Sequence, residues 1–99
     1  MTEIGAAIGY GMQKFHEAVD ALIGHGSVQE RLQQASISLS MLTPKHHLPA
    51  RLRSKFSKLV KEVNRARSLN DDDAAALAGR VLTMAREVDK EYWLWEESV

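Results

Sequence analysis

Apolar residues recur along this chain at intervals of three and four, the spacing that places side chains on one face of an α-helix. Four stretches share this pattern, and no stretch alternates convincingly with the period of two expected of a half-buried strand. The sequence therefore predicts an all-α fold. The four apolar stripes, in chain order, are Ile4, Ile8, Met12, Phe15, Val19 and Leu22; Val28, Leu32, Ala35, Leu39 and Leu42; Leu52, Phe56, Leu59 and Val63; and Leu77, Val81, Met84, Val88, Tyr92 and Trp95.

Turn and cap signals separate the predicted helices. The glycines in residues 24–26 end the first helix, and Ser27 followed by Glu30 has the spacing of a capping box that begins the second. Residues 43–48 are expected to form a loop. Pro49 then suits the first turn of a third helix, because its missing N–H would have no partner there.

The third helix is expected to run to Leu69, and the fourth begins near Asp71. Short connections between amphipathic helices favour antiparallel neighbours packed around one apolar axis. A length of 99 residues is that of one domain with a genuine core. We predict a single helical domain over residues 1–99, an antiparallel bundle of about four helices.

Two local features bear on how the helices pack. Gly5, Gly9 and Gly11 weaken the first helix by up to about 1 kcal/mol each relative to alanine, and the Gly5/Gly9 pair permits another helix to approach closely. Ile37 and Met41 lie nearly opposite the stripe of the second helix, so they either contact a third helix or are exposed. Contact is commoner in a bundle, where a helix often has two neighbours.

The charges are segregated although their formal sum is +0. Residues 45–69 carry eight basic side chains and one acidic side chain, whereas residues 70–99 carry three basic and eight acidic ones. An uncompensated basic surface is typical of a nucleic-acid binder. Here the acidic segment is expected to neutralise the basic segment within the fold.

The residues of catalytic and metal sites are missing or wrongly spaced. The chain has no cysteine, which excludes disulfides, thiolate zinc sites and cysteine nucleophiles. His16 and Asp20 share a helical face, but no third metal ligand is identifiable, so we interpret His16 as an interfacial residue. His46 and His47 are expected to be solvated in their loop. We predict no catalytic residue, no metal site and no cofactor, and hence a protein that is not an enzyme.

The sequence also lacks the signals of membrane insertion and secretion. It has no apolar run near the roughly 18 residues that a membrane-spanning helix needs, and its N-terminal residues lack the basic flank and apolar region of a secretory signal. We therefore expect a soluble cytoplasmic protein without a membrane partner.

Two surfaces are candidates for partner binding. The third helix presents Arg51, Lys55, Lys58 and Arg65 on the side opposite its stripe. Near the end of the fourth helix, Trp93 projects away from the core stripe, as aromatic anchors at protein interfaces do. The alternative for Trp93 is that it closes the open end of the bundle.

These features favour a small non-enzymatic protein-binding module, of the kind that includes inhibitors, immunity factors and regulators. Self-association into a homo-oligomer is compatible with the same surfaces. The alternative function is nucleic-acid binding, in which the basic residues of the third helix contact phosphates. Asn64 is the only amide of that helix, so base-specific reading would be poor.

Overall fold

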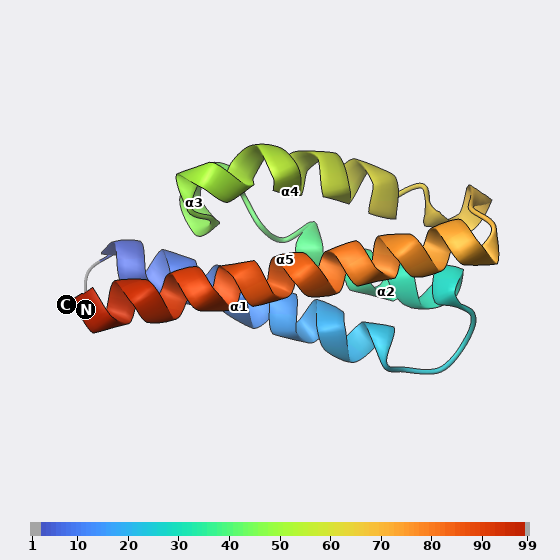
Figure 1. Cartoon of the computed structure of the whole chain (residues 1–99), viewed down its shortest axis with the longest axis horizontal. Coiled ribbons are helices and arrows are strands. Elements are labelled where there is room, and N and C mark those ends of the chain that lie inside the picture. The colour runs from blue at the N-terminus through green and yellow to red at the C-terminus, as the bar shows by residue number, and fades with distance from the viewer. Residues whose placement is uncertain (1–2, 99) are drawn as a thin grey trace.

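The computed structural model describes the backbone of residues 3–98 and the side chains of residues 7–97. Within that range the chain is all-α, and its four long helices run antiparallel to their sequential neighbours (Figure 1), which confirms the predicted fold class. None of the described helices is long and apolar enough to cross a membrane. The elements are α1 (Glu3–Leu22), α2 (Val28–Leu39), α3 (Pro44–His47), α4 (Ala50–Val63), the 3₁₀ turn η1 (Ala66–Ser68) and α5 (Asp71–Ser98).

The core is built from the predicted stripes. All four residues of the α4 stripe are buried, and Phe56 meets Phe15 of α1 edge to face with 5.8 Å between ring centroids. On α5 the stripe is buried as far as Val88, whereas Tyr92 and Trp95 are only half-buried. Burial along α5 therefore declines toward its C-terminal end.

Helix starts follow the predicted capping chemistry. The Ser27 hydroxyl accepts a hydrogen bond from the backbone N–H of Glu30 at 3.1 Å, which satisfies a donor that the first turn of α2 leaves unpaired. The Asn70 side chain accepts from the N–H of Asp73 at 2.8 Å at the start of α5. Gly26 adopts φ +101°, a conformation that glycine tolerates, where the chain turns into α2.

The region around the prolines differs from the prediction. Residues 44–47 form the helical turn α3 instead of a loop, and Pro49 precedes α4 as its N-cap. Arg53 of α4 holds the two helices together by donating from Nε to the carbonyl oxygens of Pro44 and Leu48. The predicted third helix also ends at Val63 and not Leu69, because its last hydrogen bonds tighten to the 3₁₀ pattern that forms η1.

The close approach onto α1 occurs at Gly11. A Cβ atom at this position would overlap the backbone carbonyl oxygen of His47, so α3 packs directly on the α1 backbone. Gly9 makes only ordinary contact with the Tyr92 ring, and the side-chain position of Gly5 lies outside the described residues. The expected close packing on α1 is therefore present, but with a different glycine at its centre.

The His47 side chain is packed, contrary to its expected solvation, whereas His46 is exposed. The centroid of the His47 ring lies 4.7 Å from that of the Tyr10 ring, which Lys14 also contacts. The Nδ1 atom of His47 accepts a hydrogen bond from the backbone N–H of Thr43 at 2.9 Å. That bond needs a neutral imidazole with a free Nδ1 lone pair. Burial, aided by the charge of His46, lowers the pKa of His47 below its usual value.

We expect this histidine to make the fold sensitive to mild acid. His47 takes up its proton at lower pH in the folded protein than in the unfolded chain. The contribution of His47 to the free energy of unfolding is therefore complete above about pH 6.5 and declines below that value. The free energy of unfolding should fall by about 1 kcal/mol or less, which is the net contribution of one hydrogen bond. Urea unfolding at about pH 7.5 and about pH 5, compared between the native chain and His47→Gln, isolates this residue. An equal acid-induced loss in His47→Gln would contradict the prediction, and His46→Gln is the matched control.

Candidate binding surface

The α4 helix is joined to α5 by ion pairs at two positions, and one of them neutralises a residue of its basic flank. Arg51 forms ion pairs with Glu91 and, at 3.8 Å, with Glu87, and Arg80 of α5 pairs with Glu62 of α4. The hydrogen bond from Arg80 lowers the pKa of Glu62, so this pair is fully ionised at neutral pH. The expected neutralisation of the basic segment by the acidic segment is thus confirmed for Arg51.

The other predicted basic residues remain available. Lys55, Lys58 and Arg65 are exposed, and none of them forms an ion pair within the part of the chain that the structure describes. They follow one another along α4 and the turn after it: Lys55 and Lys58 lie between Arg51 and Glu62, and Arg65 lies beyond Glu62. These three predicted cations are therefore available for contact with a partner.

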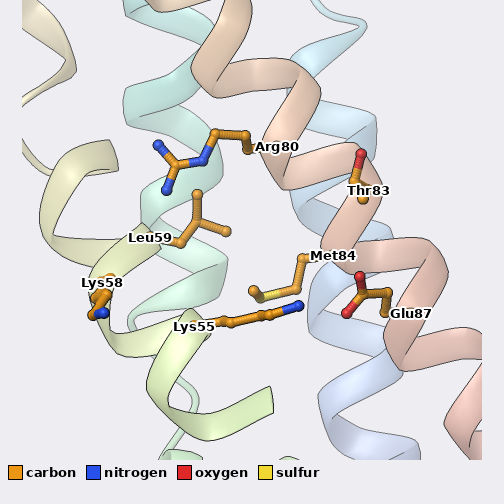
Figure 2. A pocket seen from close by; sticks show the side chains of 7 residues that line it. All are labelled: Lys55, Lys58, Leu59, Arg80, Thr83, Met84 and Glu87. Carbon is orange, nitrogen blue, oxygen red and sulfur yellow. The ribbon is translucent and has the colours of Figure 1, made fainter. Parts of the chain in front are cut away.

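These cations border a groove between α4 and α5 (Figure 2). Lys55 extends across it from α4 and Lys58 lines its α4 edge, while Arg80, Thr83 and Glu87 line it from α5. Its volume is about 250 Å³. A neighbouring cavity of about 400 Å³ shares Arg80 and extends to Arg65. We call the two together the α4–α5 groove.

The floor of the α4–α5 groove is apolar. Leu59 and Met84, both buried, lie between the two helices in Figure 2, and Leu77 and Leu69 continue this surface in the neighbouring cavity. The Thr83 hydroxyl of the groove donates to the Gly79 carbonyl at 3.0 Å. The arrangement is suited to holding an acidic group above an apolar side chain.

Trp93 lies on the last turns of α5, apart from the cations of the groove. Its side chain is 56 % exposed, so the bundle does not enclose it. The centroid of its ring lies 5.4 Å from that of the Tyr92 ring. The adjacent Leu94 is 51 % exposed. The predicted site residues therefore divide into two surfaces: the basic residues along α4, and an apolar end of α5.

The structure also decides two expectations about other surface residues. Ile37 and Met41 are 59 % and 53 % exposed, so they do not contact a third helix as favoured. His16 on α1 hydrogen bonds through Nε2 to Asp89 of α5 at 2.8 Å, which agrees with an interfacial role. No group of three metal-ligating side chains occurs among the described residues.

Comparison with known proteins adds no relative to this picture. A scan against protein-family models, a search of curated proteins and a search of solved structures each returned no match. The groove and the α5 end are therefore the features from which a function can be inferred.

Proposed function

We propose that this chain is a non-enzymatic protein-binding module that recognises an acidic protein surface, in the manner of an inhibitor, immunity factor or regulator. The observation that carries the proposal is the row formed by Lys55, Lys58 and Arg65. These residues are exposed, form no ion pair among the described residues, and lie beside a groove with an apolar floor. Cations next to an apolar floor match a partner that presents carboxylates around an apolar side chain.

The rival function, nucleic-acid binding, uses the same three cations on phosphates. The apolar side chains of the groove weaken that alternative, because a phosphate backbone has no apolar group to contact them. Binding to mixed DNA and RNA that falls steeply with added salt would support the rival. A flat titration at low salt would remove it.

A matched pair of charge reversals tests the proposal. Lys58→Glu places a negative charge at the α4–α5 groove, whereas Lys45→Glu makes the same change on α3 away from that groove. Both sites are exposed, so both variants should fold. Quantitative capture from extracts of the native cell should lose the specific partner with Lys58→Glu and retain it with Lys45→Glu. Equal capture by both variants would contradict the assignment of the groove.

The second surface is tested by Trp93→Ala. Because the indole is more than half exposed, we expect the free energy of unfolding to change by no more than about 0.5 kcal/mol. Loss of an aromatic anchor should nevertheless weaken binding of the captured partner by at least about 2 kcal/mol. Urea unfolding and titration calorimetry measure the two quantities. A stability loss of several kcal/mol would instead identify Trp93 as a residue that closes the bundle.

A further inference from the structure

The last turns of α5 form a surface that is both apolar and acidic. Trp93 and Leu94 are exposed, and the exposed carboxylates of Glu96 and Glu97 follow directly. We call these four residues the acidic tip. No basic residue lies in the last turn of α5, so both carboxylates add to the negative end of the helix dipole. Glu96 also raises the pKa of Tyr92. The acidic tip therefore concentrates negative charge that no basic residue of the last turn of α5 balances.

The α4–α5 groove has the complementary chemistry. Lys55, Lys58 and Arg65 supply unpaired positive charge, and the buried Leu59 and Met84 supply an apolar floor. Four cations and three carboxylates line the two cavities together, the carboxylates being Glu62, Asp73 and Glu87. Glu62 pairs with Arg80 and Glu87 lies 3.8 Å from Arg51, so neither carboxylate is paired with a lysine of the groove. If the tip entered such a groove, the Trp93 indole would contact the apolar floor, and the tip carboxylates would lie beside the lysines.

The acidic tip cannot reach the groove of its own chain. Helix α5 is continuous from Asp71 to Ser98, and a helix advances about 1.5 Å per residue. Glu96 therefore lies about 18 Å beyond Met84 and about 28 Å beyond Leu77 along the same rigid helix. The two complementary surfaces are held apart within one molecule, so only a second molecule can bring them together.

We propose that two copies of this chain associate, with the acidic tip of each copy seated in the α4–α5 groove of the other. Each copy has one tip and one groove, so a two-fold arrangement uses both and closes the assembly as a dimer. The inference does not rest on the proposed function, because it concerns copies of this chain alone and is tested on the purified protein.

Two charge-reversed variants test this pairing directly. Lys58→Glu/Arg65→Glu makes the groove acidic, and Glu96→Lys/Glu97→Lys makes the tip basic. In either variant alone, tip and groove carry the same sign of charge, and dimerisation should weaken by at least about tenfold in dissociation constant. In an equimolar mixture, each tip again meets a groove of opposite charge. Sedimentation velocity over a concentration series should therefore show dimers for the native chain and for the mixture, and monomers for each variant.

Several results would overturn the proposal. These are a native chain that stays monomeric over the whole concentration series, a dimer that neither variant weakens, and a mixture that fails to recover the dimer. All four substitutions are at exposed positions, so circular dichroism should show native helix content in both variants. The native chain alone provides a second measurement, because its dimer must weaken as salt rises from about 0.05 to about 0.5 M and the charges are screened. A dimer indifferent to salt would also refute the pairing.

Discussion

Replacing Phe56 by alanine is expected to lower the free energy of unfolding by about 3–5 kcal/mol. The ring is 3 % exposed and packs edge to face on Phe15, so its removal leaves a cavity where α4 meets α1. A domain of this size has only about 5–15 kcal/mol of stability in total. The variant should therefore be close to unfolding at room temperature.

Urea unfolding followed by circular dichroism measures this loss. Ser57→Ala is the matched control, because Ser57 is the next residue on α4 and is exposed. It should change stability by no more than about 0.5 kcal/mol. If Phe56→Ala cost less than about 1 kcal/mol, the packing assigned to the α4 stripe would be wrong.

Gly11→Ala should destabilise the protein although alanine is the better helix former. In an isolated helix the change would gain up to about 1 kcal/mol. Here the new methyl group meets the His47 backbone carbonyl, which cannot rotate away as a flexible side chain would, so α3 has to move off α1. We expect a net loss of about 1–3 kcal/mol, as for other overpacked sites.

Gly79→Ala is the control that separates the two effects. Gly79 lies in the interior of α5, is exposed, and has open space where a Cβ would be placed. This variant should therefore gain up to about 1 kcal/mol from helix propensity. The same substitution is thus expected to lower the free energy of unfolding in α1 and to raise it in α5. A gain in both variants would show that α3 does not pack on Gly11 as described.

The features that were predicted correctly are those set by local periodicity. The α4 stripe could be assigned because Leu52, Phe56, Leu59 and Val63 are the apolar residues of a strongly polar segment, which leaves one possible buried face. The cap at Ser27 could be assigned because its hydrogen bond is made three residues away. Neither inference needs knowledge of which helices become neighbours.

The features that were missed depend on tertiary contacts. Nothing in the glycine spacing distinguishes Gly11 from Gly9, since the distinction arises only when the His47 carbonyl of α3 is brought onto α1. The same contact packs the His47 ring against Tyr10 and explains why solvation was the wrong expectation. A helical turn as short as α3 is too brief to show a period of its own.

The candidate site was predictable in its charges and not in its shape. The helical wheel placed Arg51, Lys55 and Lys58 on one flank and placed Trp93 outside the core, and all four residues are exposed. Which cations acquire carboxylate partners depends on the register of α4 against α5, and so does the groove. That register is fixed by packing across the whole bundle and leaves no signature in either segment alone.

The burial gradient along α5 also determines what intrinsic fluorescence reports. Both tryptophans of the chain, Trp93 and Trp95, lie on its last turns, beyond the buried stripe. Fraying of these turns would change the indole emission while far-ultraviolet circular dichroism, which averages over every helix, hardly moves. A fluorescence transition at lower urea than the dichroism transition would therefore measure the local stability of one helix end, and would not by itself be evidence for a folding intermediate.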